Sequence, residues 1–187
     1  MEDSLTASAR PPRCGPYTFE SMHGPRIKDP VNVAFIDMAG GLLRVVDIVK
    51  TIGFSFGWGV GDQFFAEPDA NGVRHIQDEN RATSPVGING RDHIRIHQLY
   101  SGRKTSRTVV ASVHRERWPQ VGWFPFLKKT CDAVESFDAP RRDMALRLCS
   151  AGFLIDEIDI GNCNPLPQCD GSFPRSDGRI LLVREPD

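Results

Sequence analysis

A segment near the middle of the chain, Arg91–His97, alternates polar side chains with isoleucine at a period of two. Because successive side chains of a strand point to opposite faces of a sheet, this period predicts a strand with one polar and one apolar face. A second run, Thr108–Glu116, is rich in β-branched residues and follows Ser101-Gly102, a dipeptide typical of turns. The two segments therefore predict a β-hairpin.

The polar face of the predicted hairpin collects side chains that titrate or bind anions. The first strand contributes Arg91, His93, Arg95 and His97, and the second contributes Ser112, His114 and Glu116. Two registers keep these residues on one face: one pairs His93 with His114, and the other, shifted by two residues, pairs His93 with Ser112. A slip of one residue would separate them.

This polar face suggests a site for a phosphate-bearing ligand. One neutral imidazole of the pair His93 and His114 can accept a proton while the other, charged, donates one, so these are the candidate catalytic residues. The candidate ligand-binding residues are Arg91, Arg95, His97, Ser112 and Glu116. Three interpretations stay open: phosphoester chemistry, binding of an anion without catalysis, and a merely solvated or structural sheet face, since one wet face is common in antiparallel sheets.

A metal site is not predicted on this face. His93, His114 and Glu116 carry donor atoms, but no second carboxylate is placed to complete a divalent-metal site. The cysteines also lack the paired spacing of a structural zinc site. The sequence identifies no cofactor.

The rest of the chain predicts one α+β domain, with a mostly antiparallel sheet packed by two main helices. Residues 1–28 are rich in proline and serine and predict a flexible or loosely packed arm, which leaves 29–187 as the domain. Two strand–helix units are expected. In the first, the strand Val31–Ile36 precedes a helix with apolar residues at Leu42, Val45, Val46 and Val49.

The second strand–helix unit lies near the carboxyl end. Residues 133–137 predict a short strand, and Asp138 is a suitable N-cap for the helix that follows, because Asp favours that position. Gly53 and Gly152 are expected to end the two helices. Further strands are expected at 154–160 and 179–183.

Two aromatic segments support an alternative function. Phe54–Phe65 and Trp118–Leu127 interleave aromatic residues with glycine or proline. If they are exposed, they predict a non-catalytic module that binds a partner protein or self-associates. The two hypotheses differ in whether the histidines converge or the aromatic residues form an exposed patch.

Charge and cysteine content narrow the partners and the compartment. A net charge of -1 over 187 residues argues against a general nucleic-acid binder. Five cysteines without CxxC spacing, and an amino terminus without a secretory signal, favour reduced thiols in the cytoplasm. No run approaches the ~20 apolar residues of a membrane span. The predicted hairpin is nevertheless locally basic, which favours a small anionic ligand.

Four short motifs resemble the LssY carboxy-terminal domain family. They are the Asp29–Phe35 opening, Arg91–Ile96, the strand Val109–Glu116, and Phe137–Asp143 before the late helix. The likeness spans roughly residues 29–160, and His97 stands where the family commonly has tryptophan. The resemblance implies a domain found alone or attached to membrane proteins, including ones related to lipid-phosphate phosphatases. It implies no particular activity.

Overall fold

The computed structural model describes the backbone of residues 17–20, 26–55, 63–69, 72–75, 78–82, 91–101, 104–117, 133–161 and 176–186. Side chains are described within 29–55, 92–98, 107–115, 134–161 and 176–186. The elements are β1 (Tyr17–Glu20), β2 (Arg26–Pro30), β3 (Val33–Phe35), α1 (Gly41–Thr51), β4 (Gln63–Asp69), β5 (Gly72–His75), β6 (Asp78–Ala82), β7 (Arg91–Ser101), β8 (Lys104–Arg117), β9 (Ala133–Ser136), α2 (Asp138–Ser150), β10 (Leu154–Asp159) and β11 (Arg179–Arg184).

The described strands form two sheets. The larger runs β10-β11-β3-β8-β7-β6, with β9 also pairing with β8, and the smaller runs β2-β1-β4-β5. Every neighbouring pair is antiparallel except β11 and β3. The prediction of an α+β fold with a mostly antiparallel sheet and two main helices is therefore confirmed for the described part of the chain.

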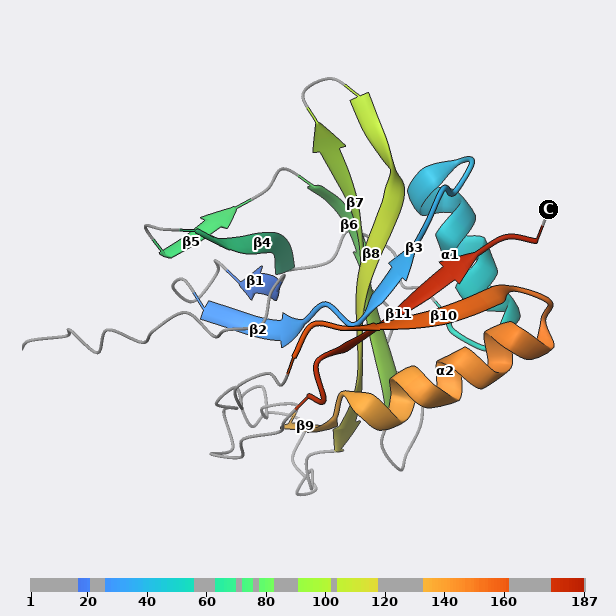
Figure 1. Cartoon of the computed structure of the whole chain (residues 1–187). Coiled ribbons are helices and arrows are strands. Elements are labelled where there is room, and N and C mark those ends of the chain that lie inside the picture. Colours follow the sequence, from blue (N-terminus) through green and yellow to red (C-terminus); the bar gives the residue numbers. More distant parts are fainter. Residues whose placement is uncertain are drawn as a thin grey trace, which may run out of the picture.

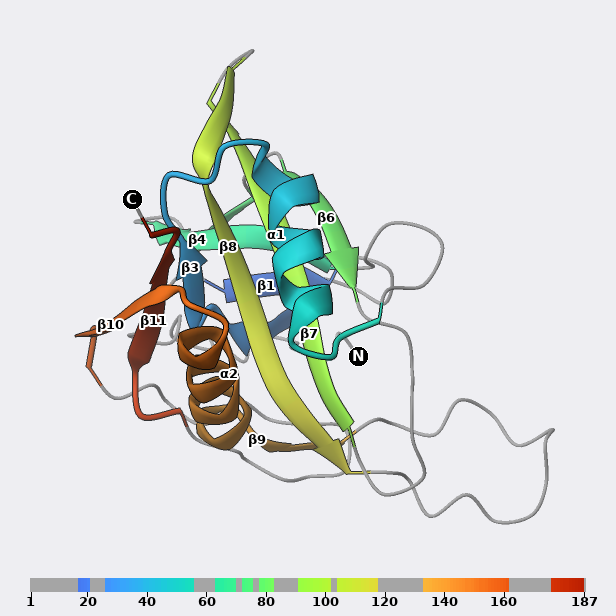
Figure 2. The same ribbon diagram turned by 90° about the vertical axis from the view of Figure 1, so that its right-hand side faces the viewer.

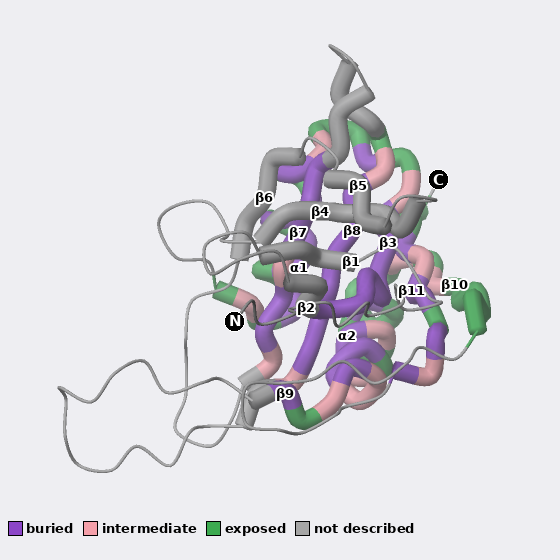
Figure 3. The backbone as a smooth tube through the Cα atoms, turned by 90° about the vertical axis from the view of Figure 1, so that its left-hand side faces the viewer, coloured by how far each residue is buried: buried purple, intermediate pink, exposed green. Residues whose placement is uncertain are grey.

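Both helices pack on the same face of the larger sheet, and the smaller sheet lies on its other side (Figures 1 and 2). Helix α1 contacts β7 and β8, whereas α2 contacts β8 and β10. From the smaller sheet, β4 contacts β6 and β7, and β2 contacts β8. The hairpin β7–β8 is therefore covered on both faces, and its middle is buried (Figure 3).

The apolar face of the hairpin forms the main core with the helices. Ile94 and Ile96 from β7 join the buried residues of α1, including Val45 and Val49, as their helical spacing predicts. Gly53, with a φ of 101°, ends α1. That left-handed conformation favours glycine because it has no Cβ atom to clash.

Helix α2 begins differently from the sequence prediction. Asp138 is its first residue rather than its N-cap, and the Oγ of Ser136 accepts a hydrogen bond from the backbone N–H of Ala139 at 3.2 Å. The carboxylate of Asp138 instead accepts a hydrogen bond from the backbone N–H of Asp177. The expectation that Asp138 is the N-cap was wrong, because its carboxylate binds a distant segment instead of the first turn of the helix.

Two strands lie in the segment for which the sequence predicts an arm. Strand β1 pairs with both β2 and β4, and β2 continues to Pro30. Through β2, the chain reaches the polar side of the hairpin just before Asn32.

The Asn32 side chain joins several elements. Its amide donates to the carbonyls of Val113 at 2.8 Å and Phe137 at 3.1 Å, and its Oδ1 accepts from the Val113 N–H at 2.8 Å. The side chain is buried, with a residue exposure of 1%. It therefore connects the start of β3 to β8 and to the start of α2.

Replacing Asn32 with alanine is expected to lower the free energy of unfolding by about 3 kcal/mol. The variant would leave buried backbone groups of Val113 and Phe137 without these partners, and each such loss costs about 1–3 kcal/mol. Urea unfolding followed by circular dichroism measures the change. Ser150→Ala, in which an exposed hydroxyl is lost from α2, is the control and should change stability by less than about 0.5 kcal/mol. A loss below about 1 kcal/mol for Asn32→Ala would contradict the role assigned to the amide.

Candidate functional site

The hairpin adopts the first of the two predicted registers. His93 lies opposite His114, Arg95 opposite Ser112, and Arg91 opposite Glu116. Strand parity places His93, Arg95, Ser112 and His114 on the face away from the helices. The side chains of Arg91 and Glu116 lie outside the described residues, and the structure gives only their backbone pairing.

This polar face is buried rather than solvated. His93 is 7% exposed, and His97, Ser112 and His114 are each 2% exposed or less. The interpretation of a solvated sheet face therefore does not hold for these residues, because a second sheet lies on that side of the hairpin. Burying polar groups costs free energy unless they are paired. The hydrogen-bond and ion-pair partners of these residues therefore bear on whether the face is structural or binds a ligand.

The two histidines meet across the strands. The ring centroids of His93 and His114 are 5.2 Å apart, with the ring planes tilted by 58°. The ring of His114 also contacts Phe137 edge-on, at a centroid distance of 6.2 Å. The register thus brings together the residues predicted to be catalytic, and one apolar ring helps to hold His114 in place.

Asp29 is a member of this cluster that sequence reasoning missed as a site residue. Its Oδ2 lies 3.3 Å from Nη1 of Arg95 and 3.4 Å from Nδ1 of His114, and the residue is 3% exposed. The sequence shows an acid before Pro30, and only tertiary structure brings it to the hairpin. Its place at the end of β2, a strand that contacts β8, is what positions the carboxylate.

These contacts define what the cluster can do chemically. Oδ2 of Asp29 lies 3.4 Å from Nδ1 of His114, which places a carboxylate beside this imidazole. His93 is then the second imidazole, and Arg95 supplies a permanent positive charge with several N–H donors. Acid–base chemistry and anion recognition are both within reach of this set.

Ser112 has an unsatisfied hydroxyl. Its Oγ is buried and has no hydrogen-bond partner among the described residues. Buried polar atoms of this kind are rare in native proteins, and each calls for an explanation. Its position between Arg95 and His114 on the polar face makes a bound ligand one such explanation.

The local basic charge predicted for the hairpin is largely balanced within the described residues. Asp29 pairs with Arg95, and Arg115 donates to both Asp92 and Asp143 at 2.7 Å. The hydrogen bond from Arg115 to Asp92 and, to a smaller extent, the one to Asp143 raise the pKa of the Arg115 guanidinium above its ordinary value. Arg107 is exposed and lies 3.7 Å from Asp37. Each of the three basic hairpin side chains that the structure describes, Arg95, Arg107 and Arg115, therefore lies near a carboxylate.

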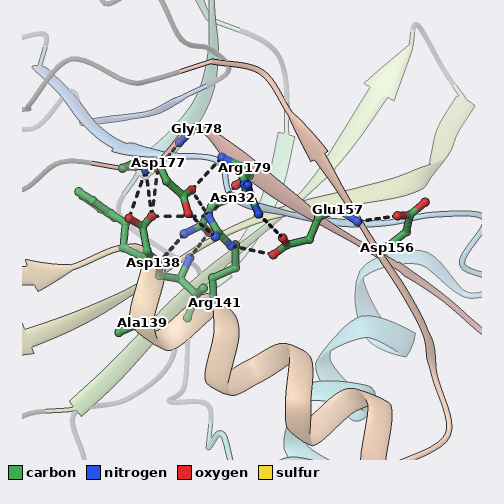
Figure 4. Close-up of polar contacts among 12 residues, drawn as sticks. Asn32, Asp138, Ala139, Arg141, Asp156, Glu157, Asp177, Gly178 and Arg179 are labelled. Atoms are coloured by element: carbon green, nitrogen blue, oxygen red, sulfur yellow. Dashed lines mark hydrogen bonds and ion pairs between the residues drawn. The ribbon is translucent and has the colours of Figure 1, made fainter.

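A second polar cluster surrounds Arg141 on α2 (Figure 4). Arg141 is 1% exposed and donates to both carboxylate oxygens of Asp177, at 2.6 and 2.8 Å, and to the Arg179 carbonyl. Asp138 and Glu157 each lie 3.5 Å from its guanidinium. Carboxylates thus surround the guanidinium, and the cluster ties α2 to β10 and β11. We assign it a structural role.

The Arg141 cluster shifts the acidity of its carboxylates in opposite directions. The hydrogen bond from Arg141 lowers the pKa of Asp177 to about 2, whereas burial raises the pKa of Asp138 above its usual value. The Asp177 carboxylate is therefore the member that most favours the folded state.

Three other sequence predictions concern metal binding, membrane spans and the aromatic segments. Within the described residues, no group of His, Cys, Asp and Glu is arranged to hold a metal ion. No described helix is long and apolar enough to cross a membrane. Phe54 packs against the main core, while the rest of Phe54–Phe65 is only partly described and Trp118–Leu127 lies outside the described residues.

No family model, curated protein or solved structure matches the chain. The resemblance to the LssY carboxy-terminal domain family therefore stays a prediction from the four short motifs. The site has to be read from its own geometry.

Replacing Asp177 with asparagine is expected to destabilise the protein by about 2 kcal/mol at neutral pH. Removing one partner of a buried ion pair costs about 3–5 kcal/mol, and we reduce this because Asp177 is one-third exposed. The lowered pKa of Asp177 gives the effect a pH window. The carboxylate stabilises the fold fully above its ordinary pKa of 3.8, and this contribution is lost as the pH falls through about 2.

Urea unfolding of the parent and Asp177→Asn between pH 7 and pH 2 tests this prediction. The stability difference should be constant above about pH 5 and shrink towards pH 2. Asp47→Asn, which removes an exposed carboxylate from α1, is the control and should show a small difference throughout. A difference for Asp177→Asn that grows on acidification would rule out the assigned pairing.

Proposed function

We propose that the chain binds a small phosphate-bearing ligand at the cluster of Asp29, His93, Arg95, Ser112 and His114, which we call the polar cluster. The observation that carries this proposal is the buried Ser112 hydroxyl without a hydrogen-bond partner among the described residues. It lies on the same face as Arg95 and the histidine pair.

The chemistry of the polar cluster favours phosphate over a neutral ligand. Arg95 offers several N–H donors, the imidazoles offer one or two each, and Ser112 offers a hydroxyl. Charge-assisted hydrogen bonds from such groups to phosphate oxygens are about twice as strong as bonds between neutral groups.

Hydrolysis is an extension of this proposal. The 5.2 Å separation of the His93 and His114 rings would let the two imidazoles act on the same phosphoester, one accepting a proton and the other donating one. The contact of Asp29 with Nδ1 of His114 supports this role, since a carboxylate partner orients an imidazole. Binding and turnover are separate outcomes, so both need to be measured.

A partner-binding module built on the aromatic segments has no comparable support. The described member of the first segment, Phe54, packs against the main core instead of forming an exposed patch. We therefore carry the ligand hypothesis forward.

Ser112→Ala is the sharpest test of ligand binding. The change removes a buried hydroxyl without a described partner, so the free protein should be as stable as the parent or slightly more stable. Ligand affinity should fall about tenfold, because a hydrogen bond to a charged group contributes about 1.5–3 kcal/mol. His93→Ala and Arg95→Ala should also weaken binding.

A thermal-shift screen of phosphorylated metabolites and inorganic phosphate, followed by calorimetry on the hits, measures these changes. Release of inorganic phosphate from any hit reports turnover. Ser150→Ala is the matched control, since it removes an exposed serine hydroxyl from α2 and should bind like the parent. No shift in the parent at millimolar ligand, or equal affinity in Ser112→Ala, would overturn the proposal.

A further inference from the structure

One carboxylate oxygen of Asp29 serves two groups of the polar cluster. Its Oδ2 lies 3.3 Å from Nη1 of Arg95 and 3.4 Å from Nδ1 of His114. The carboxylate is almost completely buried, with a side-chain exposure of 4%. Asp29 thus occupies a position between a guanidinium and an imidazole, where an anionic ligand of the same cluster would bind.

We propose that Asp29 is an internal anion that a phosphate-bearing ligand displaces, so that Asp29 sets the affinity and selectivity of the polar cluster. This inference rests on the proposed function. Two anions close together in a buried site repel each other strongly, because the low effective dielectric constant of the interior screens them poorly. The carboxylate and the phosphate therefore compete for Arg95 and His114.

The charge balance of the described cluster supports competition. Asp29 and Arg95 carry opposite charges and form an ion pair. An incoming anion therefore has to compete with the carboxylate for Arg95. A phosphate dianion carries more charge and more acceptor oxygens than a carboxylate, so it displaces Asp29 more readily than a carboxylate ligand does. Selectivity for phosphate over simple carboxylates follows.

Displacement of Asp29 also affects β2. Asp29 lies next to the last residue of β2, and its contacts with Arg95 and His114 connect that end of the strand to the hairpin. Ligand binding should therefore loosen the carboxyl end of β2. If Asp29 instead only orients His114, binding should tighten it.

Calorimetry with inorganic phosphate compares the parent, Asp29→Asn and the control Asp47→Asn, which removes an exposed carboxylate from α1. Asp29→Asn should bind phosphate at least tenfold more tightly than the parent, and the control should match the parent. Acetate should gain affinity as well, which would narrow the selectivity for phosphate. Equal or weaker phosphate binding by Asp29→Asn would overturn the inference and make Asp29 a positioning residue.

Hydrogen exchange of the unmodified chain gives an independent measurement if Asp29→Asn does not fold. Saturating phosphate should speed amide exchange at residues 26–29, and slower or unchanged exchange would overturn the inference. The two proposals fail in distinguishable ways. Absence of binding of every phosphorylated compound by both the parent and Asp29→Asn refutes the proposed function, whereas binding by the parent that Asp29→Asn does not strengthen refutes only the role of Asp29.

Discussion

The hydrogen bonding of Asn32 to Val113 is the constraint on which the arrangement of the polar cluster depends. Strands β3 and β9 both pair with β8, and the Asn32 side chain fills the place between them. Val113 is followed directly by His114, and Asn32 is preceded closely by Asp29. The pairing of Asn32 with Val113 therefore sets the position of the chain along β8 and also brings the Asp29 carboxylate to His114. A change in this pairing would move both the sheet edge and the polar cluster.

The two buried polar clusters differ in how their polar atoms are paired among the described residues. Arg141 lies among carboxylates that neutralise it and hold α2 against β10 and β11. Ser112 lies equally deep, yet its hydroxyl has no partner among the described residues. A fold gains nothing from an unsatisfied hydroxyl, because burying it costs free energy that alanine at the same position would avoid. This asymmetry directs attention to the hairpin rather than to Arg141.

The sequence predicts the individual strands and helices of this fold better than the contacts between segments far apart in the chain. Period-two alternation identifies β7 and its faces, and helical spacing identifies α1, because these patterns depend on neighbours along the chain. Two contacts could not be predicted: the contact of Asp29 with Arg95, and the hydrogen bond that Asp138 accepts from the Asp177 N–H. Both join segments that are far apart in the sequence. The burial of the polar face was missed for the same reason. Its cover includes β2, which the sequence places partly in an arm.

The pairing of charges changes how an anionic ligand would be recognised. The count of arginines along the hairpin suggests attraction by an open basic surface, but Arg95 and Arg115 already have carboxylate partners. Each of these two pairs presents little net charge to the solvent. Under the proposed function, an anionic ligand would compete for these partners at short range, where the number and geometry of oxygen atoms matter more than total charge. A buried carboxylate that shares its partners with the ligand would make such a site selective.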